Sequence, residues 1–449
     1  LVETAAFTVT DQPAGSCLFH KLLDVVDKAG KLYDCINVSS SDDAASRRFE
    51  RDLKSFESID GFVFAYWLST SLLKKYRILP TVSKRHIIAR SGLQTCDNFR
   101  FLRLVWEIPL IAQETLKWWP RLTKGGDYQP FWSDIPLVVY WQDDGKQVKA
   151  FIESLYDQWS KQIPSVNLYW KPGATYTERT TSAISLRVLP ETCLFDKKGP
   201  FIGFSKTPFD RALVLQFIAL SYTTPIKALI ESSVGLRDAT SSGSPARDYL
   251  PSIIERLPLP CLPPEDSERI LHNSLTCVLR HREIASGDEE SSVWRPMVPW
   301  PAQLSISALA LSVIKSTRRQ LRELYRAFSE IEERALSIFG LTSAETASLD
   351  ELLGESILRF GGDDFEVESE TLAQLVSLNV DQLVDAVAES HRITAATLKQ
   401  AYLGDRTIEL LAFHFRRHPS RILQKLDDFA IVSPRDLVKV AQTVVSFAV

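Results

Sequence analysis

Two adjacent glycines, Gly125 and Gly126, follow Lys124 in a segment whose residue types could bind a phosphate. Glycine lets backbone amides approach an anion closely, and the lysine adds a positive charge. A simple tight turn would use the same glycines. The segment therefore indicates either a phosphate-binding loop or a turn.

Other side chains between residues 90 and 260 suit contact with nucleic acid. Gln94 could pair with adenine through two hydrogen bonds, and Arg100 or Arg179 could pair with guanine in the same way. Three hydroxyl side chains could position phosphates, namely Thr175, Tyr176 and Thr180. The full set of candidate DNA contacts is Gln94, Arg100, Lys124, Gly125, Gly126, Tyr128, Lys171, Thr175, Tyr176, Arg179, Thr180, Arg187 and Lys198.

Arg187 lies inside a predicted strand, Ser-Leu-Arg-Val-Leu. Its guanidinium either points to the DNA or pairs with a buried carboxylate. Trp132, Trp141 and Trp170 are expected in the core more than against bases. This region is expected to mix scaffold residues with contact residues, and base-reading side chains usually lie in loops.

The sequence contains no recognisable catalytic or metal site. It lacks the Asn-Pro-Pro-Tyr run of adenine methylation, a glycine-rich cofactor loop, a Walker loop and the acidic pattern of a nuclease. His414 and His418 could share a helix face, but the glutamate of a zinc protease is missing between them. Asp143 and Asp144 are better explained as a hairpin turn than as a catalytic pair. We therefore expect binding rather than catalysis, and no metal.

The charge of the chain is unevenly distributed. Residues 345–389 contain twelve acidic residues against Arg359 alone, a charge of −11, which leaves +7 for the rest of a chain of net charge −4. A basic body with an acidic appendage is compatible with DNA binding by the body. The acidic stretch is otherwise explained as a solvated helical face.

Length and composition predict a cytoplasmic protein of two to four domains among its 449 residues. The six cysteines form no Cys-x-x-Cys pair and suit reduced thiols. The longest apolar runs, such as 212–220, are too short to span a bilayer, and no signal segment opens the chain. The strand-like start and the apolar end at 440–449 lead us to expect a piece of a longer polypeptide.

Hydrophobic periodicity predicts an α+β protein whose second half is helical. The expected strands are 2–10, 17–23, 137–141, 185–189 and 201–204. The expected helices are 61–78, 210–222, 225–232 and 304–339, with further helices from 345 to 449 interrupted at 361–364. The long helix carries four arginines that could meet phosphate or could be balanced by Glu330, Glu332 and Glu333. These arginines are Arg318, Arg319, Arg322 and Arg326.

Several blocks together resemble the recognition region of BREX and type IIG adenine methyltransferases, in the order and at spacings similar to those of that family. The blocks are Gly92-Leu-Gln-Thr-Cys-Asp-Asn-Phe-Arg-Phe101, Lys124-Gly-Gly-Asp-Tyr-Gln-Pro-Phe-Trp-Ser-Asp134, Val138-Val-Tyr-Trp141, Lys171-Pro-Gly-Ala-Thr-Tyr176 with Arg179-Thr180, Ser185-Leu-Arg-Val-Leu-Pro190, Lys198-Gly-Pro200 and Ile254-Glu-Arg-Leu-Pro-Leu-Pro260. A later block, 287–299, resembles the family less closely. Residues 331–341 look like the end of the family's long helix. Residues 446–449 look like the start of a further motif.

The resemblance implies a division of the chain. Residues 1–60 would be the tail of a methyltransferase domain with the terminal strands of its sheet, and 61–89 a linking helix. Residues 90–265 would form a mixed-sheet DNA target-recognition domain, followed by a long-helix scaffold at 266–344 and an acidic helical region at 345–449.

The resemblance also implies a function and partners. The parent protein would be an adenine-specific DNA methyltransferase of a phage-defence or restriction-modification system. Its S-adenosyl-methionine would lie in a catalytic domain outside this chain. The partners would be double-stranded DNA and that catalytic domain. An alternative is an assembly module that docks other defence proteins or a phage DNA-mimic inhibitor.

Overall fold

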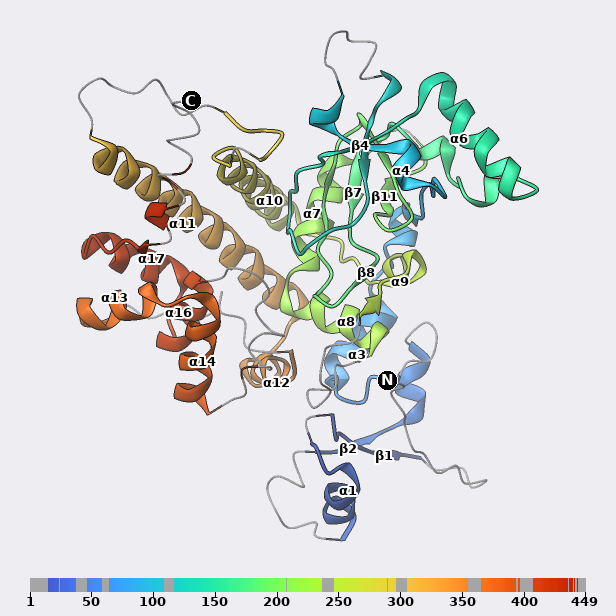
Figure 1. The fold of residues 1–449 in the computed structure, drawn as a ribbon. Helices are drawn as coiled ribbons and strands as arrows, with labels where there is room; N and C mark the ends of the chain where they lie inside the picture. Colours follow the sequence, from blue (N-terminus) through green and yellow to red (C-terminus); the bar gives the residue numbers. More distant parts are fainter. Residues whose placement is uncertain are drawn as a thin grey trace.

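The protein combines helices with several small sheets, which confirms the mixed α and β composition expected from the sequence (Figure 1). The predicted strand at 2–10 and the break at 361–364 lie outside the described residues. The computed structural model describes residues 15–23, 25–37, 47–58, 64–108, 117–206, 208–235, 246–288, 290–295, 305–353, 365–392, 395, 407–434, 436–438, 440 and 442.

An antiparallel hairpin lies near the N-terminus, at the end of the molecule drawn lowest in Figure 1. Strand β1 (Cys17–His20) pairs with β2 (Arg48–Arg51), and helix α1 (Lys28–Asn37) lies between them in sequence. The predicted strand at 17–23 is confirmed over its first four residues. Neither β2 nor α1 was expected.

The aromatic-rich segment after the hairpin becomes helical later than the sequence suggested. Helix α3 (Thr70–Ile78) begins at Ser69, whose hydroxyl accepts a hydrogen bond from the backbone N–H of Leu72 at 3.2 Å. This N-cap fixes the start of the helix. The residues before it pack as turns, with Tyr66 stacked on Phe19 at 4.9 Å between ring centroids. The predicted start at residue 61 is therefore wrong, while the predicted end is right.

The central sheet is antiparallel, in the order β3-β11-β7-β9. Its strands are β3 (Ile87–Arg90), β11 (Phe201–Phe204), β7 (Gly173–Thr175) and β9 (Arg187–Leu189). All four residues of β11 are buried, because neighbouring elements cover both faces of the strand. Such a strand is apolar throughout, which is why the sequence predicted it correctly.

A second, mixed sheet has the order β10-β5-β6-β4. Strand β10 runs parallel to β5, and the other two pairs are antiparallel. The strands are β10 (Cys193–Phe195), β5 (Arg121–Thr123), β6 (Leu137–Val139) and β4 (Leu102–Leu104). This sheet and helix α6 share a hydrophobic core of their own, which includes Leu122, Val139 and Phe195.

Helix α6 (Gln142–Leu155) replaces the predicted hairpin turn at Asp143 and Asp144. Asp143, Asp144 and Gly145 have positive φ angles of 52°, 55° and 73°, so they form a left-handed turn. Val148 and Ile152 then lie four residues apart and are both buried, as on the inner face of a helix. The hairpin prediction was wrong because the apolar stripe that follows the turn has helical spacing.

Two mainly apolar helices follow the central sheet in sequence, and the first of them packs on β7 and β9. Helix α7 (Arg211–Ser221) and helix α8 (Thr224–Val234) match the predicted helices and are largely buried. No single described helix is long and apolar enough to cross a membrane; these two reach that length only as a pair bent by 77°. The short helix α9 (Pro251–Arg256) follows after β12 (Arg247–Asp248), which pairs with β8 (Arg179–Thr180).

The long helix α11 (Ile306–Phe339) confirms the strongest helical prediction. The Ser305 hydroxyl caps its start, and Gly340 ends it at φ +61°. It lies against α10 (Pro264–Ala285), and it also contacts α7, α8 and α17 (Figure 1). The helix thus joins the sheet region to the C-terminal helices. Helix α12 (Ser343–Leu353) follows it and contacts α8.

The last helices have a separate hydrophobic core. We call them the C-terminal helical unit: α13 (Ser369–Ser377), α14 (Val380–His391), α16 (Thr407–Phe415) and α17 (Pro419–Asp428). The remaining short elements are α4 (Asn98–Phe101) and the 3-10 helices η1 (Leu53–Ser58), η2 (Ser83–Arg85), η3 (Val105–Glu107), η4 (Trp159–Lys161) and η5 (Val166–Leu168).

Candidate nucleic-acid interface

The segment Lys124–Gly126, which we call the glycine loop, leaves the end of β5 and turns back toward the β10–β11 connection. Both glycines have left-handed backbones, with φ of 79° at Gly125 and 123° at Gly126. A Cβ atom on Gly125 would lie 2.9 Å from the carbonyl oxygen of Lys198. Only glycine fits this position without a shift of its neighbour. Blocks far apart in the sequence therefore meet at this loop.

Arg187 lies behind the glycine loop and is 3% exposed. Its Nη2 donates to the Gly125 carbonyl at 3.0 Å, and its guanidinium also donates to the Thr177 hydroxyl and to Ser185. The Thr177 hydroxyl in turn donates to the Gly126 carbonyl at 3.0 Å. Desolvation by burial lowers the pKa of Arg187.

This placement settles the two alternatives for Arg187. The side chain does not reach the surface, and no carboxylate in the described part of the chain lies within ion-pair distance of it. Hydroxyl and carbonyl oxygens satisfy the guanidinium instead. Arg187 thus positions the glycine loop from inside the protein.

The two lysines at the loop are held by buried acids. Lys124 donates to the Asn98 side chain at 2.8 Å and lies 3.6 Å from Asp196. Lys198 pairs with Glu178 at 2.8 Å. Burial raises the pKa of Asp196, although the lysine charges and the Lys198 amide oppose the shift. The lysine side chains remain 27% and 46% exposed, so both can still meet a phosphate.

Arg179 and Thr180 form β8, an exposed two-residue strand held by β12. The Arg179 guanidinium lies 3.2 Å from Asp248 on β12. The Thr180 hydroxyl accepts a hydrogen bond from the Ser182 amide at 3.0 Å. Arg179 is 58% exposed at its side chain and keeps access to solvent.

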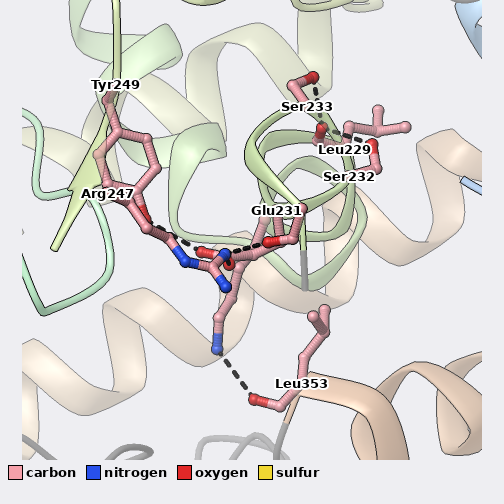
Figure 2. Close-up of polar contacts among 9 residues, drawn as sticks. Leu229, Glu231, Ser232, Ser233, Arg247, Tyr249 and Leu353 are labelled. Atoms are coloured by element: carbon pink, nitrogen blue, oxygen red, sulfur yellow. Dashed lines mark hydrogen bonds and ion pairs between the residues drawn. The ribbon is translucent and has the colours of Figure 1, made fainter. Parts of the chain in front are cut away.

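A buried ion pair anchors β12 from inside the protein (Figure 2). Arg247 Nη1 lies 2.8 Å from Glu231 Oε2, and both side chains are less than a tenth exposed. The Tyr249 hydroxyl donates to the other oxygen of Glu231 at 3.2 Å. The pair joins β12 to helix α8. It therefore holds the strand on which Arg179 depends.

Arg100 lies on α4, which runs into β4, whereas Gln94 follows Leu93, which bridges to Asp196 just after β10. Arg100 is exposed, and its guanidinium stacks 4.9 Å from the Phe151 ring centroid and 5.1 Å from that of Phe101. Gln94 is half-buried, and its backbone N–H donates to the Gln162 carbonyl at 2.7 Å. The Gln94 and Arg100 side chains thus stay accessible to a ligand at this surface.

The structure places two predicted phosphate contacts in the core. Thr175 is 1% exposed and Tyr176 is fully buried. Neither side-chain oxygen has a hydrogen-bond partner in the described structure, and burial raises the pKa of Tyr176 well above its usual range. A phosphate reaches neither side chain here, so we remove both from the candidate contacts. Lys171 donates to the Ser205 carbonyl at 2.7 Å, and Tyr128 is half-buried.

Two contacts made by residues of the resembling blocks are structural. The backbone of Gly92 passes so close to Phe195 that a Cβ atom would lie 1.9 Å from its carbonyl oxygen. Asp134 accepts hydrogen bonds from the amide of Ser292, at 2.6 Å, and from its hydroxyl. This contact ties the block after α10 to the mixed-sheet region.

Two of the four arginines of α11 are held by contacts within the protein. Arg318 and Arg322 both pair with Asp427 on α17, at 3.2 and 2.6 Å. Arg318 also donates to the Ile431 carbonyl at 2.5 Å and is 6% exposed. These two side chains dock the C-terminal helical unit on α11, while Arg319 and Arg326 are exposed.

The proposed histidine pair does not share a helix. His414 lies on α16, whereas His418 caps the start of α17 after a left-handed turn at Arg416. Within the described ranges, no group of three or more His, Cys, Asp or Glu side chains could hold a metal ion.

Sequence reasoning missed an exposed aromatic beside the loop. Phe99 on α4 is 96% exposed, and Trp106 on η3 is 61% exposed. Phe99 belongs to the first block of the resemblance. Its residue type, however, predicted burial.

No protein-family model matches the chain. It is similar to the adenine-specific methyltransferase BrxX of Escherichia coli O9:H4 (strain HS), with 24% identity over 210 residues, 44% of this chain and 16% of that protein. It is also similar to the adenine-specific methyltransferase PglX of Lacticaseibacillus casei (strain Zhang), with 22% identity over 271 residues, 57% of this chain and 22% of that protein. The matched part thus spans less than a quarter of each curated relative. These similarities support a relation to adenine-specific methyltransferases of the BrxX and PglX kind.

Proposed function

We propose that this chain recognises a specific sequence in double-stranded DNA on behalf of an N6-adenine methyltransferase. The observation that carries the proposal is the glycine loop, braced by the buried Arg187 and flanked by the half-exposed Lys124 and Lys198. Cations on a preorganised loop suit phosphate contact. The similarity to two adenine-specific methyltransferases supports DNA as the phosphate-bearing ligand and methylation as the purpose of the contact.

The lysines would exchange one partner for another on binding. Lys124 and Lys198 are neutralised by Asp196 and Glu178 in the free protein. A phosphate that enters the loop would share or replace these pairs and release counterions from the DNA. Binding would then weaken as salt rises. Exposed Arg100 and the Gln94 side chain would read bases, since bidentate arginine and glutamine contacts carry sequence information.

The methyl transfer itself belongs, in this proposal, to a catalytic domain outside this chain. S-adenosyl-methionine would bind in that domain, and the target adenine would leave the base stack there. The present chain would clamp the flanking duplex. Its partners would be the DNA and the catalytic domain, in a phage-defence or restriction-modification system.

A second candidate function is protein assembly through the C-terminal helical unit. This unit has its own hydrophobic core, and its acidic side chains lie on the outside. The exposed acids of the unit and of the residues just before α13 are Glu366, Glu368, Glu370, Asp381, Asp385, Glu389 and Asp428. Such a surface would repel DNA and suits a basic partner protein.

Selection from a pool of random duplexes, followed by sequencing, tests the first function. The whole chain is incubated with the pool at about 50 and about 200 mM salt. We expect an enriched sequence and weaker recovery at the higher salt. Salt-sensitive binding without enrichment would place sequence reading outside this chain. Absence of binding at both salt concentrations would contradict the proposal and favour the assembly function.

A further inference from the structure

Phe99 is an apolar side chain exposed on a rigid part of the surface. It is 96% exposed, whereas Phe101, two residues later on the same turn, is 1% exposed and belongs to the core of the mixed sheet. A phenylalanine left in water forgoes roughly 2 kcal/mol of burial free energy. Folding alone therefore gives no reason for phenylalanine at this position.

Several hydrogen bonds hold the turn that carries Phe99. The Asp97 carboxylate accepts from the Arg100 amide at 3.0 Å, and the Thr95 hydroxyl donates to the Asn98 side chain at 2.9 Å. Arg103 donates to the Phe99 carbonyl at 2.7 Å. The ring is thus presented by a backbone fixed on both sides.

The residue before this turn has a strained backbone. Cys96 has a φ of 58°, in the left-handed region that residues other than glycine and asparagine rarely adopt. Such a conformation costs on the order of 1 kcal/mol and persists where surrounding contacts impose it. At this turn the imposed conformation sends the chain outward to Phe99.

Positive charges surround the exposed ring. Arg100 follows Phe99 directly and is exposed, and Arg103 on β4 places its guanidinium on the Phe99 carbonyl. Lys124 of the glycine loop reaches Asn98, the residue before Phe99, at 2.8 Å. An apolar tip between cations complements a duplex, whose phosphates flank stacked bases.

We propose that Phe99 inserts into the DNA as a wedge, stacking on a base and opening one base step. This inference rests on the proposed DNA recognition and adds the residue that would deform the duplex. Aromatic or aliphatic side chains that enter a base step kink the DNA. Arg100 and Lys124 would hold the phosphates on either side of the opened step. Flexible pyrimidine–purine steps would be preferred, because they unstack most easily.

The test compares F99A, F99W and Y33A with the unmodified chain. Tyr33 is a matched control, since it is 68% exposed and lies on α1 at the far end of the molecule (Figure 1). The probe is a fluorescent pool of random duplexes of about 30 base pairs, long enough for one interface. Anisotropy gives the affinity at several salt concentrations, and permanganate gives the number of unstacked thymines.

F99A is expected to weaken binding roughly tenfold, with an unchanged salt slope because no phosphate contact is lost. F99W and Y33A should bind as the unmodified chain does. Permanganate reactivity in the complex should disappear in F99A alone.

The wedge is overturned, and DNA recognition is left intact, if the unmodified chain binds DNA and F99A binds it equally well and unstacks as many thymines. A loss of self-association in F99A, with unchanged DNA binding, also overturns it and assigns Phe99 to a contact between copies. Failure of the unmodified chain to bind any duplex would refute the proposed function itself.

Discussion

The buried guanidinium of Arg187 donates to the carbonyl of Gly125 at 3.0 Å and so fixes the backbone of an exposed loop from inside the protein. A buried cation is costly to desolvate unless its donors are satisfied. Here the Arg187 guanidinium also donates hydrogen bonds to the hydroxyls of Thr177 and Ser185. These hydrogen bonds offset the desolvation cost of the buried charge, and one of them fixes the loop.

Replacing Arg187 by methionine is expected to loosen the loop. R187M keeps much of the volume but removes every donor, so the Gly125 carbonyl and the Thr177 hydroxyl lose a partner at a cost of about 1–3 kcal/mol. Hydrogen–deuterium exchange of the 121–128 peptide should rise, and DNA affinity should fall. R187K keeps the charge but not the fork of donors, so its exchange rate and DNA affinity should lie between those of R187M and the unmodified chain. Unchanged exchange of this peptide in R187M would refute the bracing role.

Gly125 should not tolerate a side chain. G125A combines a φ of 79° with a Cβ atom 2.9 Å from the Lys198 carbonyl oxygen, so we expect a loss of about 1–3 kcal/mol in unfolding free energy. Gly287 is the matched control, because a Cβ atom there would lie at an ordinary 3.5 Å from the Ile284 carbonyl oxygen. Thermal unfolding of both variants measures the difference. Equal melting temperatures for G125A and the unmodified chain would show that the loop is not constrained.

Asp427 should hold the C-terminal helical unit on α11. D427A leaves Arg318, whose side chain is 7% exposed, without its carboxylate, which typically costs about 3 kcal/mol. Limited proteolysis should release the unit faster than in the unmodified chain. D428A, which changes the exposed neighbouring carboxylate, is the control and should behave as the unmodified chain. DNA affinity should stay unchanged in D427A; a large loss would return the α11 arginines to the DNA interface.

His418 should make the C-terminal helical unit sensitive to acid. Desolvation, and then Arg326 and Arg421, lower its pKa from 6.5 to about 4. The unfolded chain therefore binds a proton between pH 6.5 and 4 that the folded chain does not, and stability falls as the pH drops through this window. The loss is on the order of 1–3 kcal/mol. Above pH 7 the group contributes nothing to this dependence.

The variant H418N isolates this effect. The Nδ1 atom of His418 accepts from the Ser420 amide at 3.3 Å as an N-cap, and asparagine can cap a helix without titrating. Chemical unfolding at pH 7 and pH 5 should show a smaller difference in H418N than in the unmodified chain. Equal differences would mean that His418 protonates freely in the folded protein.

Local patterns were sufficient for part of the fold. Helices α7, α8 and α11 and strand β11 followed from the spacing of their apolar residues, since α11 is long and the others are mainly apolar. Helix α3 was predicted too long. Ser69 caps its start, but the aromatic residues before Ser69 gave no sign that the helix begins there.

The candidate site was harder to predict, because the pairing and burial of its side chains depend on contacts between residues distant in sequence. Lys124 pairs with Asp196 across the β5–β10 connection, and Arg187 reaches Gly125 over 62 positions. Tyr176 has a residue type suited to phosphate, but it follows β7 directly and is fully buried. Phe99 was overlooked for the opposite reason, since nothing in its type indicates exposure.

Lysine footprinting tests the central claim most directly. The whole chain is acetylated with and without the random duplex pool, and mass spectrometry gives the protection of each lysine. We predict that DNA protects Lys124 and Lys198 and leaves Lys425, on α17, as reactive as before. Protection of Lys425 or of Lys315 on α11, with Lys124 and Lys198 unchanged, would contradict recognition through the glycine loop.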